Sequence, residues 1–204
     1  IAIGIIAGVI NGIVVAYLNV PPFVATLGML TAASGLAYAI GGGAPINGLP
    51  ENFGVLANTK LFGFQLPVYI MIISFIVLGL VMKYSAFGLR VYAVGGNRTA
   101  AEVAGVNAKR TLIQVYTLSG FLAATSGVVL ASRVISGPPN LGQGYELLAI
   151  AAVVIGGASL MGGRGTVWGT LLCLLIIQTL KNGLDILIVP SYWQNVIIGV
   201  VIVS

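Results

Sequence analysis

Long apolar runs alternate with short polar segments along the chain. Seven apolar stretches can be separated, at residues 1–18, 23–40, 66–82, 112–131, 147–161, 166–180 and 193–203. Most of them approach the ~20 residues that a helix needs to cross a bilayer. Because a backbone inside a membrane must satisfy its own hydrogen bonds, such runs predict helices. The pattern therefore predicts an all-α, polytopic helical membrane protein with about seven membrane segments, joined by loops that include residues 41–65 and 133–144.

One long polar segment, residues 84–110, interrupts this pattern. Within it, the run Thr99-Ala100-Ala101-Glu102 fits a capping box, so we expect a helix to begin at Thr99 and to end near Gly105. A helix of about six residues is not stable alone and needs a surface to lie against. The segment therefore predicts a docking helix at the membrane surface, and an ordinary cytoplasmic loop is the alternative. Its expected contact face consists of small side chains, namely Ala100, Ala101, Val103 and Ala104, flanked by Arg98, Lys109 and Arg110.

The same segment carries a resemblance to a known family. The run Gly95-Gly96-Asn97-Arg98, followed by Ala100-Ala101 and Ala104-Gly105-Val106, resembles the cytoplasmic loop of the permeases of ATP-binding-cassette sugar importers of the ribose type. In that family this loop forms a coupling helix that docks on the ATPase subunit. The resemblance implies a single transmembrane permease domain over residues 1–204 with a cytoplasmic coupling loop at 84–110. It implies ATPase-coupling roles for Gly95, Gly96, Asn97, Arg98, Thr99, Ala101, Glu102, Ala104 and Gly105.

A second stretch extends the resemblance. Residues 142–172, GQGYELLAIAAVVIGGASLMGGRGTVWGTLL, resemble the late signature of the same family, and residues 45–54 resemble one of its extracytoplasmic loops. Many members have Asp where this chain has Leu148, so Glu146 is the one carboxylate left there. The apolar run 147–161 is slightly short for a bilayer and contains Gly156-Gly157, so we expect it to be tilted, broken or re-entrant and a candidate element of the translocation path.

Composition and charge narrow the function. A chain with 58% hydrophobic and 6% charged residues is not a soluble globule. The net charge of +5 is concentrated between apolar runs, as membrane orientation requires, so we expect no nucleic-acid partner. The chain has one cysteine, Cys173, and no histidine. We therefore expect no metal site, no cofactor and no enzymatic activity on this chain. The run from Gly157 to Arg164 partly matches a P-loop but lacks its Lys-Ser/Thr ending.

The basic residues predict which ends of the helices face the cytoplasm. Alternate loops place six on one side and three on the other. The positive-inside rule assigns the richer side to the cytoplasm, which puts the expected docking helix there and the loops at Pro45 and Pro138 outside. The six are Lys83, Arg90, Arg98, Lys109, Arg110 and Arg164, and the three are Lys60, Arg133 and Lys181.

Small and polar residues within the apolar runs predict helix contacts and a solute path. Glycines spaced four apart let two membrane helices approach closely, so we expect packing at Gly4, Gly8 and Gly12 and again at Gly165 and Gly169. Hydroxyl and amide side chains could contact a polar solute, although hydroxyls often bond to their own helix instead. The candidates for the path are Asn11, Thr26, Thr31, Ser119 and Gln178.

These observations predict a subunit that does not energise transport itself. All four acidic residues, Glu51, Glu102, Glu146 and Asp185, fall at or beyond the ends of the apolar runs, where they are poorly placed for ion coupling. We expect the transmembrane subunit of an ATP-driven importer, working with a cytoplasmic ATPase that binds ATP and Mg²⁺. The alternatives are a permease for branched-chain amino acids and an autonomous channel or secondary carrier.

The resemblance also implies the remaining partners and the location. It implies a monosaccharide such as ribose as the solute, a second permease copy or close relative, and an extracytoplasmic solute-binding protein. It implies a multi-pass protein in the plasma (inner) membrane of a prokaryote. Because the sequence opens within an apolar run and without an initiator Met, we expect it to be a piece of a longer permease, truncated at its N-terminus and at its C-terminus.

Overall fold

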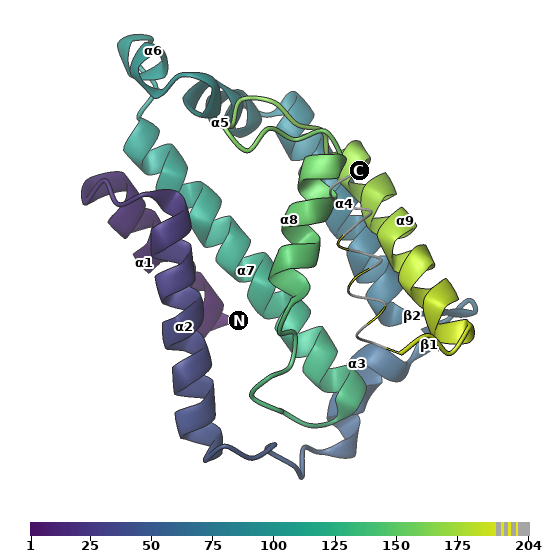
Figure 1. Cartoon of the computed structure of the whole chain (residues 1–204). Coiled ribbons are helices and arrows are strands. Elements are labelled where there is room, and N and C mark those ends of the chain that lie inside the picture. The colour runs from purple at the N-terminus through teal and green to yellow at the C-terminus, as the bar shows by residue number, and fades with distance from the viewer. Residues whose placement is uncertain (191–192, 194–195, 197–198, 200–204) are drawn as a thin grey trace.

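The structure is a computed structural model that describes residues 1–190, 193, 196 and 199. The described chain is mostly helical, with one small antiparallel hairpin (Figure 1). Most of the predicted segment 193–203 lies outside the described residues. By length and composition, four described helices could cross a membrane: α2 (Pro22–Gly41), α4 (Leu66–Tyr84), α7 (Ala108–Val134) and α9 (Val167–Ile186). The chain is thus a helical, multi-pass membrane protein.

The other elements are shorter. Two are apolar helices of intermediate length, α1 (Ala2–Tyr17) and α8 (Tyr145–Ile155). The predicted loop 41–65 contains a 3-10 turn and helix α3, then a hairpin in which Lys60 pairs with Gln65 and Leu61 with Phe64. The predicted polar segment contains two helices. The bounds of these elements are η1 (Glu51–Gly54), α3 (Val55–Asn58), β1 (Lys60–Leu61), β2 (Phe64–Gln65), α5 (Ala86–Gly96) and α6 (Arg98–Val103).

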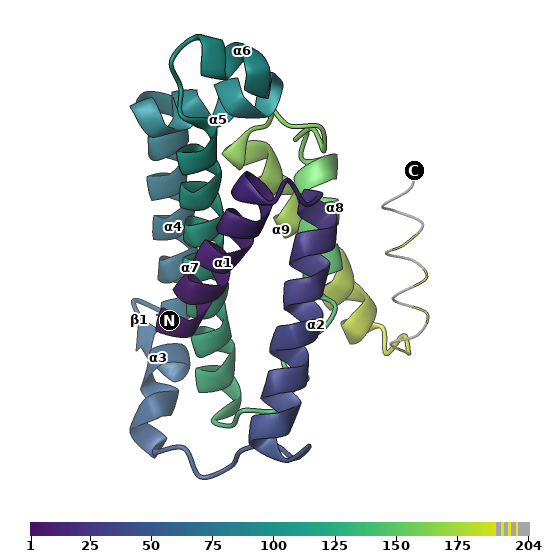
Figure 2. The ribbon, with the colours of Figure 1, turned by 90° about the vertical axis from the view of Figure 1, so that its left-hand side faces the viewer.

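The most extensive helix contact joins α1 to α7, and the glycines of α1 make it possible (Figure 2). A Cβ added to Gly8 would meet the backbone of Tyr116, and one added to Gly12 would lie 2.7 Å from the Cα of Ile113. Gly4 lies in the same way against Gly120 and Ala124. Lipid supplies no hydrophobic drive between membrane helices, so close contact of this kind stabilises the pair by dispersion.

Helix α2 stands at the edge of the molecule and its main contact is with α1 (Figure 2). None of its residues is buried. Gly28 and Gly35 would each meet nothing within 4 Å if they carried a Cβ. The predicted span 23–40 therefore exists as a helix, and most of its surface is exposed in the described part of the chain.

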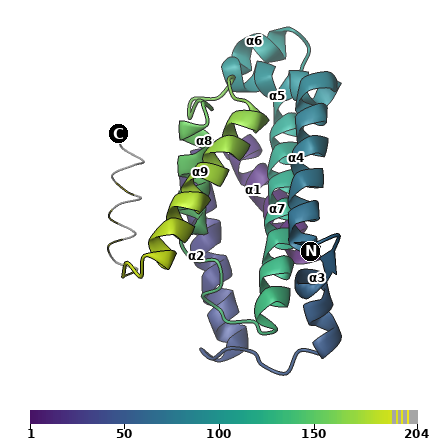
Figure 3. The same cartoon turned by 90° about the vertical axis from the view of Figure 1, so that its right-hand side faces the viewer.

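The helices run between two ends, and the chain returns to each of them several times (Figures 1 and 3). One end, which we call the α6 end, carries α5, α6, the turn after α8 and the turn before α2. The other, the α3 end, carries α3, the hairpin and the loop before α8. The six basic residues assigned to the richer side all lie on elements of the α6 end. Lys60 and Arg133 lie at the α3 end, and Lys181 lies in the last turns of α9, toward that end.

At the α3 end the two predicted external loops touch each other. Ile46 and Gly137 form an isolated antiparallel bridge. The Ser132 hydroxyl, fully buried, donates a 2.6 Å hydrogen bond to the carbonyl of Phe53. The second of these loops is shorter than predicted, because α7 continues to Val134. Arg133 therefore belongs to the last turn of a helix and not to the loop.

Candidate functional site

Helix α6 forms where the sequence predicted a docking helix, but its cap is different. The Asn97 side chain, and not that of Thr99, caps the helix: its Oδ1 accepts a hydrogen bond of 2.9 Å from the backbone N–H of Ala100. Asn is at least as good as Thr in this role, and Asn97 has the extended backbone that a cap needs. The helix therefore begins at Arg98 and the predicted capping box is wrong.

The end of α6 is the one predicted. Gly105 has a positive φ of 82° and its N–H donates to the Glu102 carbonyl, while the Val106 N–H donates to the Ala101 carbonyl. This pair of bonds is a Schellman motif, in which glycine is favoured because a Cβ would be strained. Glu102 does not return to the cap and instead forms an exposed ion pair with Arg98, at 3.3 Å.

The small face of α6 is divided between the chain's own core and the surface. Ala101 is only 4% exposed and packs with Val94 of α5 and Ala108 of α7. It holds α6 on the body and so does not belong to an exposed contact face, which corrects that part of the prediction. Val103, by contrast, is 86% exposed, and Ala104 beside it is also exposed. These two side chains form a small apolar surface at the α6 end.

Helix α5, which sequence reasoning did not find, connects the last turn of α4 to α6. The Ser85 side chain caps it by accepting from the Gly88 N–H at 3.1 Å and donates to the Val81 carbonyl at 2.6 Å. Gly88 is buried where an added Cβ would meet the backbone of Met82. A serine cap before a run of apolar residues at helical spacing was the available signal. The basic residues of the segment are instead typical of a surface loop.

The C-terminal end of α5 lies directly against the turn between α8 and α9. A Cβ added to Gly162 would lie 2.6 Å from the carbonyl oxygen of Gly95, and one added to Gly163 would lie 2.6 Å from the Cα of Gly96. The Tyr92 hydroxyl ties the same two elements by donating to the Gly165 carbonyl at 3.0 Å. The two stretches that carry the resemblance to permeases, far apart in sequence, are therefore in backbone contact.

The turn itself is closed by its own backbone. Helix α8 ends in a second Schellman motif, because the Gly157 N–H donates to the Val154 carbonyl and the Ala158 N–H to that of Val153. Gly157 has a φ of +89°. The predicted apolar run 147–161 is thus interrupted, and its helix of 11 residues is only about 16 Å long, well short of a bilayer.

Helices α8 and α9 then cross at a glycine pair. A Cβ on Gly156 would lie 2.7 Å from the backbone of Gly169, and Gly165 lies close to Ala158. Leu148 packs on the buried cluster that Ala152 and Cys173 form between the two helices. A carboxylate at Leu148 would face this apolar cluster. Glu146 instead accepts a hydrogen bond of 3.0 Å from the Gly144 N–H.

The candidate path residues are not brought together. Thr26 and Thr31 donate their hydroxyls to carbonyls of their own helix, at 3.0 Å in each case to the fourth residue back. Asn11 is half-buried on α1, and Ser119 and Gln178 are exposed on α7 and α9. None of the five lines the four cavities of ≈ 690, 480, 300 and 270 Å³ that the described residues form. Their assignment to a path stays a prediction.

In chemical terms, the site is suited to transmit movement. The residues that the structure describes include no group of three or more metal-ligating side chains. What the α6 end does contain is a short helix joined to α5 and α7 by a small apolar cluster, and a glycine contact that links α5 to the turn between α8 and α9. Helix α6 is therefore connected to α5 and α7 through packed side chains, and α5 is connected to the turn between α8 and α9 through packed backbone, an arrangement that is difficult to deform.

Comparisons with known proteins give the site a context. The family described as "Branched-chain amino acid transport system / permease component" matches residues 1–204. The ribose import permease protein RbsC of Bacillus subtilis is 42% identical over 194 residues, which cover 94% of this chain and 60% of that protein. The galactose/methyl galactoside import permease protein MglC of Haemophilus influenzae is 41% identical over 210 residues, covering 99% of this chain and 62% of that protein.

A further relative is the probable ABC transporter permease protein YphD of Escherichia coli, 43% identical over 187 residues that cover 91% of this chain and 56% of that protein. The chain thus spans about three fifths of the length of these curated relatives. No solved structure matches the chain.

Proposed function

Because the chain belongs to the permease-component family of branched-chain amino acid transport systems, we propose that it is the transmembrane subunit of an ATP-binding-cassette importer for a monosaccharide. The choice of solute class follows the relatives at about 40% identity, which are named for ribose or galactose import. The match is to a family named for amino acids, so a branched-chain amino acid is the second candidate solute.

One structural observation supports the mechanism more than any other. Helix α6 projects from the body at the α6 end and exposes Val103 and Ala104 while Ala101 fixes it from beneath (Figure 1). In the proposal this end faces the cytoplasm, α6 docks in a groove of a separate ATPase subunit, and ATP and Mg²⁺ bind to that subunit. The chain itself then has no catalytic step. The coupling residues are those of the 95–105 stretch, with Ala101 acting as the anchor of α6 on its own body.

The remaining parts of the assembly follow from the same proposal. A second permease copy or close relative completes the path, and the exposed sides of α2 leave room for such contacts. An extracytoplasmic solute-binding protein docks at the α3 end. We further propose about seven membrane segments in the plasma membrane of a prokaryote, made of the four long helices, the shorter α1, the interrupted run 147–161 and the apolar stretch 193–203 of the sequence. Nucleotide-dependent movement of α6 shifts the population between outward-open and inward-open states.

The proposal is tested by placing a charge on the exposed face of α6. In proteoliposomes with the ATPase subunit and the binding protein, we expect Ala104→Arg to lower ATP-dependent uptake of labelled ribose or galactose at least about tenfold, because an unpaired guanidinium in an apolar groove costs several kcal/mol. Membrane insertion should be unchanged, and ATP hydrolysis should no longer drive uptake.

The matched control is Ala104→Ser, which keeps the small volume and should transport normally. Normal uptake by Ala104→Arg would exclude docking at this face. Uptake of a labelled branched-chain amino acid in place of sugars would select the second candidate. Uptake that persists without ATP or the ATPase subunit would favour a channel or secondary carrier.

A further inference from the structure

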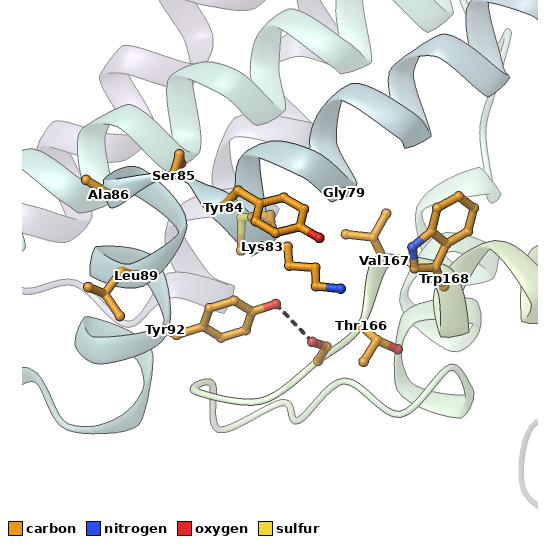
Figure 4. A pocket seen from close by; sticks show the side chains of 12 residues that line it. Gly79, Lys83, Tyr84, Ser85, Ala86, Leu89, Tyr92, Thr166, Val167 and Trp168 are labelled. Carbon is orange, nitrogen blue, oxygen red and sulfur yellow. Dashed lines mark hydrogen bonds between the residues drawn. The ribbon is translucent and has the colours of Figure 1, made fainter.

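A cavity of ≈ 690 Å³ lies at the α6 end, between the last turn of α4, the first turns of α5 and the start of α9 (Figure 4). It is distinct from the exposed face of α6, since no residue of α6 lines it. In Figure 4 the Lys83 ammonium projects into this space between Tyr84, Tyr92 and Trp168. The lining thus combines one cation with three aromatic side chains.

None of the carboxylates in the described part of the chain forms an ion pair with Lys83. Its ammonium lies 5.2 Å from the centroid of the Tyr84 ring, an interaction that does not neutralise charge. No Asp or Glu is among the residues that line the cavity. Over the described ranges the one ion pair is that of Arg98 with Glu102. A solute with negative charge would therefore meet an uncompensated cation here.

A second basic residue lines a neighbouring cavity. A smaller cavity of ≈ 300 Å³ adjoins this one and shares Tyr92, Gly165 and Thr166 with it, and Arg164 lines the smaller cavity. Each of the two cavities thus has one basic residue in its lining, Lys83 of α4 in the larger and Arg164 of the turn between α8 and α9 in the smaller. Tyr92 and Gly165 line both cavities, and the Tyr92 hydroxyl donates a hydrogen bond to the Gly165 carbonyl.

The position of the cavity along the helices is that of lipid headgroups. Lys83 and Tyr84 are the last two residues of α4, and Trp168 is the second residue of α9. These are the ends of two helices that are long enough to cross a bilayer. Trp and Tyr concentrate at the level of the headgroups, and a Lys at a helix end extends its ammonium to the same level.

From these observations we propose that the cavity binds the headgroup of an anionic phospholipid, with the Lys83 ammonium on the phosphate and Trp168 and Tyr84 against the glycerol region. A basic pocket between membrane helices is a suitable site for such headgroups. A zwitterionic lipid carries its own cation and would gain less. The proposal depends only on the α6 end lying at a membrane surface, so its failure would leave the proposed transport function untouched.

The fluorescence of Trp168 provides a direct test, because bromine on acyl chains quenches a tryptophan that it contacts. The sequence has two tryptophans, so Trp193→Phe isolates the signal of Trp168. This chain is reconstituted in phosphatidylcholine vesicles with an increasing share of brominated phosphatidylglycerol, or of brominated phosphatidylcholine. We expect stronger quenching by the anionic lipid, equivalent to a relative affinity about fivefold higher, the factor that corresponds to ~1 kcal/mol per lysine near an anionic surface.

Three variants and one added anion make the result specific. Lys83→Gln should remove the preference for the anionic lipid and Lys83→Arg should keep it. Lys60→Gln, which removes the same charge at the α3 end, should leave the preference unchanged. Inorganic phosphate at millimolar concentration should not displace the lipid. Equal quenching by the two lipids, an unchanged preference in Lys83→Gln, an equal loss in Lys60→Gln, or displacement by free phosphate would each overturn the proposal.

Discussion

At the scale of single residues, four glycines decide how the α6 end is built. Gly95 and Gly96 end α5, Gly162 and Gly163 turn the chain between α8 and α9, and the two pairs meet through their backbones. Gly162 and Gly163 also have positive φ values, 86° and 74°. Any side chain at Gly162 would therefore face both backbone strain and the carbonyl of Gly95. The contact joins the two motifs on which the resemblance to permeases depends.

We expect Gly162→Ala to destabilise the chain more than Gly157→Ala does. Both residues have a φ close to +90°, so both variants incur the left-handed strain of about 1–2 kcal/mol. Only Gly162 would also place its Cβ against Gly95, since Gly157 would meet nothing within 4 Å. Overpacking should add roughly 1–3 kcal/mol. Thermal unfolding in detergent and ATP-dependent uptake measure the difference between the two variants. Equal losses of stability would show that the contact between Gly162 and Gly95 does not contribute to stability.

Residue-level prediction from sequence was correct where one residue type is strongly preferred, and it was wrong where two caps compete or where packing decides. The end of α6 at Gly105 follows from the preference of glycine for positive φ, and the structure has it there. The start was misplaced because Asn97 and Thr99 are both good caps, and sequence does not show which residue has the extended backbone. The burial of Ala101 depends on Val94 and Ala108, whose proximity arises only from the fold.

At the scale of elements, the pairing of α1 with α7 follows from the glycines of α1. Sequence predicted that Gly4, Gly8 and Gly12 would favour a close helix contact but could not name the partner. The structure places α7 against them, with Gly120 facing Gly4. Helix α2 has small residues as well, yet Gly28 meets nothing within 4 Å. A glycine pattern therefore predicts that close contact is possible, and the fold decides which helix uses it.

Gly8→Leu should separate α1 from α7, because its side chain has no space beside the backbone of Tyr116. We expect a loss of stability of at least about 1–3 kcal/mol, the usual cost of overpacking. The control is Gly28→Leu on α2, which adds the same side chain where there is open space and should change stability by less than about 0.5 kcal/mol. Unfolding curves of the two purified variants in the same detergent compare them directly, and similar midpoints would argue against the contact.

Two elements show the limits of hydropathy. Helix α5 was missed because it is shorter than a membrane span and lies in the basic segment 84–110, although the Ser85 side chain caps it. The run 147–161 was predicted to be tilted, broken or re-entrant, and the structure ends its helix at Ile155 because the N–H groups of Gly157 and Ala158 close a Schellman motif. Apolar length is visible in sequence, whereas the point at which glycine stops a helix depends on the carbonyls that its neighbours can reach.

At the scale of the whole molecule, charge and topology agree. The six basic residues of the richer side gather at the α6 end, and the two predicted external loops meet at the α3 end through Ile46 and Gly137. This arrangement could be predicted by counting charges in alternate loops, because each apolar run reverses the direction of the chain. A route for the solute could not be predicted in the same way, since the candidate polar residues are spread over α1, α2, α7 and α9 and none of them lines the four cavities described above.

The central claim is that the exposed face of α6 is covered by an ATPase subunit, and the chemical accessibility of Val103 tests it most directly. Cys173, the one cysteine of the sequence, is buried and can be replaced by Ala. In that background, Val103→Cys places a thiol on the face of α6, and Phe62→Cys places one at the α3 end, where Phe62 is 93% exposed. We predict that a bulky maleimide labels both variants in the isolated permease, and that adding the ATPase subunit protects Val103→Cys alone. Equal labelling of Val103→Cys with and without that subunit, in every nucleotide state, would contradict the account.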